Sequence, residues 1–228
     1  MRKSLLIMTT ATVAIFFFGG SVAEAAVSIT NRTDNKVNFT SGEGVITPPV
    51  DPANPDNPIA PNPVDPKDPE NSGTGQTGPL SIDYVSNIKF GEHKITGKNI
   101  SYKAINVNPF VQVTDLRGAG DGWSLSAKMT EFKSGNKVLK GATVAIQDGF
   151  VKAGSSSNVS LAPNKSDVLF NNEESELVMS AVDKGGRGTW LTVWSANKSI
   201  QLNVIAGTPE VNTEYTSSIT WELKDAPK

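Results

Sequence analysis

The chain of 228 residues contains no cysteine and a single histidine, His93. Without cysteine it can form no disulfide, no thiolate nucleophile and no cysteine-bound zinc site. One histidine is too few for a multi-histidine metal site. The formal net charge of −2 is far from the basic footprint of a nucleic-acid-binding protein. These shortages argue against most classes of enzyme, and we expect no catalytic residues, no cofactor, no bound metal and no nucleic-acid partner.

Long hydrophobic runs are also scarce, because only Leu5–Phe18 forms one. Arg2 and Lys3 precede this run, and a small-x-small tripeptide ending at Ala25 follows it. This order of features is typical of a secretory signal peptide with an apolar core of about 7–15 residues. We predict that residues 1–25 are the signal peptide, cleaved between Ala25 and Ala26. We expect no membrane span in the mature chain, so retention at a surface would require non-covalent binding.

The composition changes sharply after a polar N-terminal segment at residues 26–45. Ten of the 14 prolines lie between residues 46 and 79, separated mainly by aspartate and asparagine. Proline fixes φ and biases the preceding residue toward extended geometry, so such a tract resembles a semi-rigid spacer. It has too little apolar surface to fold alone. We therefore predict a disordered, extended linker over residues 46–79.

Residues 80–228 show alternation of apolar and polar side chains with a period of two. In the stretch 123–129, Trp, Leu, Ala and Met alternate with Ser, Ser and Lys. The stretch 215–223 alternates in the same way, and glycine-rich turn clusters separate such stretches. This pattern is typical of half-buried strands. It predicts an all-β domain, an antiparallel β-sandwich of the Ig-like kind.

Two Trp-x-Leu tripeptides stand out within this domain. Gly122 precedes the proximal tripeptide, which consists of Trp123 and Leu125 around a serine. The distal tripeptide lies in a longer pattern made of Tyr215, Ile219, Thr220, Trp221, Leu223 and Pro227. Paired motifs with this spacing, following a signal peptide and a polar linker, resemble the WxL domain of Gram-positive surface proteins. The resemblance covers about residues 80–228.

The resemblance implies a secreted, non-enzymatic protein that is retained at the cell surface by non-covalent attachment to peptidoglycan. It also implies possible partners among other surface proteins of the same assembly or host matrix proteins. Trp123, Leu125, Trp221 and Leu223 would form the wall-binding motif.

How the tryptophans contribute is left open by the sequence. Both rings lie on apolar strand faces, which favours a role in the core. Alternatively, one or both rings lie in a surface groove and stack on sugars or peptide methyl groups. Two rival functions also remain: a scaffold that binds another protein at a sheet edge, and a glycan-degrading enzyme using Asp115 and Asp121.

Overall fold

The computed structural model describes residues 30–57, 64–171, 174–195 and 198–225. The predicted signal peptide, with its cleavage site between Ala25 and Ala26, lies outside the described residues, and so does Pro227. Residues 30–38 belong to a separate unit and are exposed, without regular secondary structure. The compact unit that holds the strands begins at Phe39.

The described residues form 14 β-strands and no helix, as the period-two alternation predicts. The strands are β1 (Leu80–Val85), β2 (Ile100–Lys103), β3 (Phe110–Asp115), β4 (Trp123–Met129), β5 (Lys133–Ser134), β6 (Lys137–Val138), β7 (Thr143–Ile146), β8 (Phe150–Ala153), β9 (Asn164–Lys165), β10 (Val168–Phe170), β11 (Glu176–Ala181), β12 (Gly188–Val193), β13 (Ile200–Val204) and β14 (Ile219–Asp225). No helix in this part of the chain is long and apolar enough to cross a membrane.

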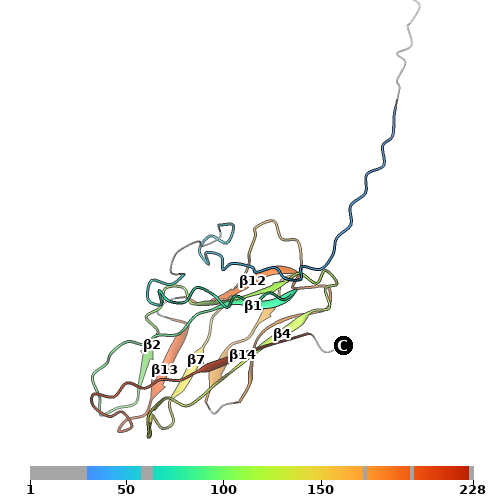
Figure 1. The fold of residues 1–228 in the computed structure, drawn as a ribbon. Coiled ribbons are helices and arrows are strands. Elements are labelled where there is room, and N and C mark those ends of the chain that lie inside the picture. The colour runs from blue at the N-terminus through green and yellow to red at the C-terminus, as the bar shows by residue number, and fades with distance from the viewer. Residues whose placement is uncertain (1–29, 58–63, 172–173, 196–197, 226–228) are drawn as a thin grey trace, which may run out of the picture. The chain divides into compact units, whose positions relative to one another are not determined.

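Twelve of these strands make three antiparallel sheets of four strands each, and β5 pairs with β6 in a hairpin. The sheet orders are β1-β3-β12-β8, β10-β7-β13-β2 and β14-β4-β11-β9. Figure 1 shows β1 and β12 in one layer, facing a layer that contains β2, β13, β7, β14 and β4. The prediction of an all-β antiparallel sandwich is therefore confirmed.

The main core lies between the layers and draws side chains from all three sheets. The strand β4 shows why: Trp123, Leu125, Ala127 and Met129 are buried, whereas Lys128 on the opposite face is exposed. Side chains alternate between the two faces of a strand, so one face enters the core and the other meets solvent. The sheet β1-β3-β12-β8 contributes Ile82, Val111, Val113 and Trp190 to the same cluster.

This last sheet is also buried on its outer face. All six residues of β3 are buried. A second apolar cluster lies on the outer face and consists of Val50, Tyr84, Phe110, Leu191 and Val193. A strand that is apolar on both faces needs a cover on each side. Here the cover is the described part of the proline-rich segment, residues 46–57 and 64–79, which we call the strap.

The strap is fastened to the sheet by specific hydrogen bonds. The side chain of Gln112 on β3 accepts from the N–H of Val50 at 2.9 Å and donates to the carbonyl of Pro48 at 3.1 Å. Lys152 on β8 donates to the carbonyl of Pro52 at 2.6 Å. At the other edge of the sheet, the N–H of Thr74 donates to the carbonyl of Asp83 at 2.9 Å. The strap thus crosses the sheet and also covers the free edge of β1.

The strap contains a nine-residue repeat, Pro-Val-Asp-Pro-x-Asn/Asp-Pro-Asp/Glu-Asn, at residues 49–57 and 63–71. The described parts of both copies place their valine against the same outer cluster. They also share turn hydrogen bonds: Ala53 N–H to Asp51 Oδ1 and Lys67 N–H to Asp65 Oδ1, both at 2.8 Å. The repeat therefore encodes a small turn unit with one apolar anchor.

The described part of residues 46–79 differs from the disordered linker that the composition predicts. The prediction rested on the small apolar surface of the tract itself. It did not consider that β3 and β12 present a second apolar face, which supplies the surface on which the tract becomes ordered. The sheet layers and the strap form one compact unit.

Removing the strap tests this arrangement. A fragment of residues 80–228 exposes Tyr84, Phe110 and Leu191 on the outer face, whereas a fragment of residues 39–228 keeps them covered. We expect the shorter fragment to lose several kcal/mol of unfolding free energy, since each large apolar side chain contributes about 1.5–3 kcal/mol on burial. Urea denaturation and binding of a hydrophobic dye to both fragments measure this. Equal denaturation midpoints would show that the strap is only a spacer.

A buried carboxyl lies beneath the strap. Asp83 is 3% exposed and accepts hydrogen bonds from Ser81 (2.7 Å), Gln112 (2.9 Å) and Thr114 (2.6 Å). Burial raises the pKa of Asp83, although the three hydrogen bonds act in the opposite direction. An Asp in the unfolded chain has a pKa of about 3.9. As pH rises above that value, Asp83 therefore stays protonated to a higher pH in the folded state than in the unfolded state.

The pH dependence of stability follows from that sign. The contribution of Asp83 to the unfolding free energy is greatest at low pH. It falls as pH rises from about 4 through the raised pKa of Asp83. In Asp83→Asn the amide oxygen can still accept from Gln112 and Thr114, and its NH₂ can donate to Ser81. We expect this variant to lose that part of the pH dependence in urea titrations between pH 3 and 8. Asp183→Asn, at an exposed position, serves as the control and should keep it.

Candidate functional site

The fold brings the two Trp-x-Leu motifs together on neighbouring strands. β14 pairs with β4 in antiparallel register, with Leu223 opposite Leu125 and Trp221 opposite Ala127. Asp225, two residues after the distal motif, lies opposite Trp123. Nearly 100 positions of sequence separate two motifs that form one continuous patch on a single sheet.

The proximal motif is fully buried. Trp123 and Leu125 are both 0% exposed and belong to the main core. The indole N–H of Trp123 donates to the carbonyl of Gly186 at 3.1 Å. A buried Trp removes about 150–250 Å² from water, which stabilises the fold by about 4–6 kcal/mol at roughly 25 cal/mol per Å². This geometry gives Trp123 a structural role and leaves it no direct access to a ligand.

Two glycines make room for this indole and its strand. At Gly186 (φ +70°) an added Cβ would lie 2.3 Å from the Cβ of Ala181 and 2.6 Å from Nε1 of Trp123. At Gly122 (φ +76°) it would lie 2.4 Å from the carbonyl oxygen of Ala181. Both positions combine a left-handed backbone with a close approach, so only glycine fits there. Steric crowding therefore explains why glycine precedes the proximal motif.

The distal motif lies at the edge of the sheet, because β14 is the terminal strand in the order β14-β4-β11-β9. Trp221 and Leu223 are half-buried and pack against the main core. Tyr215 and Ile219 are half-buried against the same core, whereas Thr220 is exposed on the opposite face of the strand. The distal motif therefore closes the core and also reaches the surface.

Arg117 ties the ends of both motifs together. Its Nε and Nη2 donate to the carboxylate of Asp115 at 2.9 and 2.7 Å, and Nη2 donates to the carbonyl of Gly122 at 2.7 Å. Its Nη1 bonds Asp225 at the end of β14. The hydrogen bond with Asp115 raises the pKa of Arg117, so the guanidinium stays charged. No sequence pattern pointed to this residue, since its bond with Asp225 joins segments 108 positions apart.

A loop connecting β11 to β12 carries the acceptors for two indoles. The indole of Trp190 donates to the carbonyl of Arg187 at 3.0 Å, next to the Gly186 carbonyl that accepts from Trp123. The sequence identified this Gly-Gly-Arg-Gly stretch only as a turn. Trp190 is 5% exposed and belongs to the main core.

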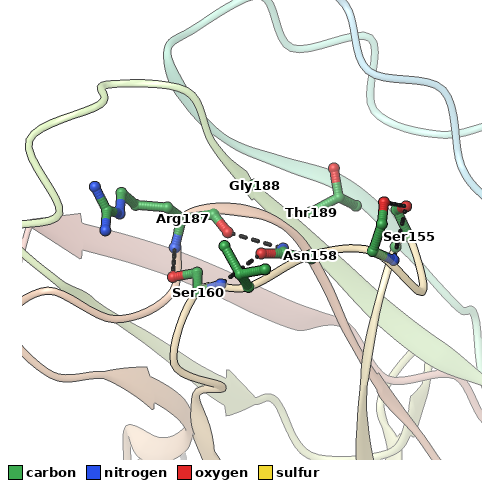
Figure 2. Close-up of a pocket in the computed structure, with 9 residues that line it drawn as sticks. Ser155, Asn158, Ser160, Arg187, Gly188 and Thr189 are labelled. Atoms are coloured by element: carbon green, nitrogen blue, oxygen red, sulfur yellow. Dashed lines mark hydrogen bonds between the residues drawn. The ribbon is translucent and has the colours of Figure 1, made fainter. Parts of the chain in front are cut away.

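The same loop forms one wall of a pocket of about 490 Å³ (Figure 2). The pocket lies where this loop meets the segment after β8. Small and polar residues line it, but their apolar atoms make up more of the lining surface than their polar atoms do. The lining residues are Gly154, Ser155, Ser157, Asn158, Val159, Ser160, Arg187, Gly188 and Thr189. Among the residues that the structure describes, no cluster of three or more His, Cys, Asp or Glu side chains could hold a metal ion.

The comparisons agree with the geometry of the paired motifs. A family model described as WxL domain, surface cell wall-binding, matches residues 26–227. The chain belongs to the WxL family. The match covers nearly the whole chain, so it includes the strap as well as the sandwich. No curated protein and no solved structure matches the chain.

For this WxL domain, the fit between Trp123 and its glycine can be tested directly. In Gly186→Ala the new methyl group collides with Ala181 and with the indole. The alanine must also adopt a positive φ, which is strained for a residue with a side chain. We expect a loss of about 2–5 kcal/mol of unfolding free energy, from backbone strain of roughly 1–2 and overpacking of roughly 1–3 kcal/mol.

Gly118→Ala is the matched control for this change. Gly118 also has a positive φ (+83°), but an added Cβ there meets nothing within 4 Å. It should cost only the backbone strain of about 1–2 kcal/mol. Denaturation curves of the two variants measure the difference, and equal losses would mean that the space around Trp123 is not limiting.

Proposed function

We propose that this chain is an exported, non-enzymatic surface protein whose WxL domain attaches non-covalently to peptidoglycan. Membership of a surface cell wall-binding family supports attachment to the wall. The observation that carries the proposal further is the placement of the distal motif, which is half-buried at a sheet edge and registered against a buried proximal motif. This arrangement leaves one aromatic ring partly accessible on a rigid support.

The two motifs have different roles in this proposal. Trp123 and Leu125 hold β4 in the core, and Trp221 with Leu223 offer the accessible part of the patch. An aromatic ring with one apolar face and an N–H donor suits contact with sugars and with peptide methyl groups. Export depends on the predicted signal peptide at residues 1–25.

The carboxyl groups considered for glycan hydrolysis support a non-catalytic role. The side chain of Asp115 is fully buried and occupied by the two-point contact with Arg117. A glycosidase needs two carboxyl groups that flank a scissile bond, one of them free to transfer a proton. Asp115 is held as a structural ion pair, so the pair of Asp115 and Asp121 is a poor candidate for that chemistry.

A second candidate function is supported by the same edge strand. β14 has seven residues and ends its sheet, so its outer edge could receive a strand from another surface protein or a host matrix protein. In that case the chain is a scaffold or adhesin subunit whose main contact is a protein.

Retention on purified, protein-free sacculi distinguishes these functions. We expect the native chain to sediment with sacculi, and Trp221→Ala to bind about tenfold more weakly, equivalent to about 1.4 kcal/mol. Phe150→Ala is the control, because Phe150 is a 41% exposed aromatic residue on β8, in another sheet. Thermal unfolding of each variant is recorded in parallel.

Three outcomes are informative. Weaker retention of Trp221→Ala, with its melting transition largely kept, supports direct contact by the distal motif. Retention equal to that of the native chain would remove the distal motif from the contact surface. Failure of the native chain to bind sacculi, with recovery on walls that keep their proteins, favours the scaffold.

A further inference from the structure

The pocket of Figure 2 is built on the two buried tryptophans. The indoles of Trp123 and Trp190 donate to the carbonyls of Gly186 and Arg187, two consecutive residues of the β11–β12 loop, and Arg187 lines the pocket. Each bond is worth about 0.5–1.5 kcal/mol, and each orients one peptide plane of the loop. The core therefore sets the position of this wall.

The opposite wall is fixed by polar contacts. The amide of Asn158 donates to the carbonyl of Arg187 at 3.0 Å, and the N–H of Arg187 donates to the hydroxyl of Ser160 at 3.0 Å (Figure 2). On the far side, the N–H of Ser156 donates to Asp56 of the strap at 2.8 Å. The pocket is thus preformed, which lowers the entropy cost of binding a ligand.

The pocket presents serine and threonine hydroxyls together with apolar surface, to which the side chain of Val159 contributes. Val159 lines the pocket and is 99% exposed, although it is a large hydrophobic residue. Ser155 and Ser157 share a hydrogen bond of 3.0 Å and keep further lone pairs and hydrogens for other partners. Thr189 lies on the same side as Ser155, whereas the guanidinium of Arg187 points away from these hydroxyls (Figure 2).

We propose that this pocket is a subsite for the glycan of the wall polymer, and that Trp123 is the residue that positions it. The inference rests on the proposed attachment to peptidoglycan. An N-acetylated sugar offers hydroxyl and amide groups for the serines and Thr189, and an acetyl methyl group for Val159. A volume of about 490 Å³ lies within the range of roughly 300–1,000 Å³ for small-ligand sites.

This assignment explains how a fully buried residue can belong to a binding motif. Trp123 cannot touch a ligand, because it is 0% exposed. Through the Gly186 carbonyl it instead holds the loop whose next residues, Arg187 and Gly188, line the pocket. Loss of the indole N–H would then weaken binding through the loop.

The first test changes the exposed apolar side chain. Val159→Asp places a carboxylate among the pocket hydroxyls and disturbs no core contact. Val211→Asp is the matched control, since Val211 is 73% exposed and is not among the pocket residues. The full chain and both variants are titrated with purified sacculi and with glycan fragments that a muramidase releases from them.

We expect Val159→Asp to bind both probes about tenfold more weakly, with Val211→Asp unchanged and all three melting transitions alike. If the native chain binds and Val159→Asp binds equally well, the pocket is not a subsite, and the proposed function stands. If the native chain binds neither probe, the proposed function and this inference both fail.

The second test concerns the positioning role. Trp123→Phe keeps most of the ring volume and removes the N–H that bonds Gly186. If Trp123 acts through the pocket, Val159→Asp should cause little further loss of glycan binding in the Trp123→Phe background, because the two changes affect one site. Fully additive losses in this double-mutant cycle, at concentrations where both variants are folded, would overturn the role assigned to Trp123.

Discussion

The space around the indole of Trp123 is the constraint on which the rest of the structure depends. The ring needs a volume that only glycine at position 186 leaves open, and its N–H needs the acceptor that the same glycine provides. Because Gly186 belongs to the β11–β12 loop and Trp123 begins β4, this one contact fixes where two sheets meet. Arg117 then joins the start of β4 to the end of β14 from the surface side.

A second requirement arises from the sheet β1-β3-β12-β8, which is apolar on both faces. Its inner face packs into the sandwich, so the outer face must be covered by another segment or remain an exposed hydrophobic patch. The strap meets this need with little apolar material, one valine per nine-residue repeat, and with backbone groups that Gln112 and Lys152 bond. A segment with the composition of a spacer is therefore part of the domain. Its Asp56 also accepts a hydrogen bond from Ser156 in the pocket loop.

The sequence allowed the strands, the sandwich and the paired motifs to be predicted, because period-two alternation and motif spacing are local signals. It did not reveal the strap, since order there is imposed by a sheet face formed from β3 and β12 far along the chain. Nor could it reveal Gly186 or Arg117, whose importance lies in contacts between segments distant in sequence. The choice between a buried and an accessible tryptophan was also left open, because alternation gives the face of a strand and not its place in the sheet.

That last distinction separates the two halves of the family signature. β4 has neighbours on both sides, so its Trp and Leu are sealed in the core, whereas β14 has a neighbour on one side only and its Trp and Leu keep partial access to solvent. Since Leu125 and Leu223 are directly opposed, cross-strand packing couples the accessible motif to the buried one. A change at Trp123 is therefore expected to affect both the distal motif, which is paired with β4, and the β11–β12 loop, which accepts the hydrogen bond of its indole.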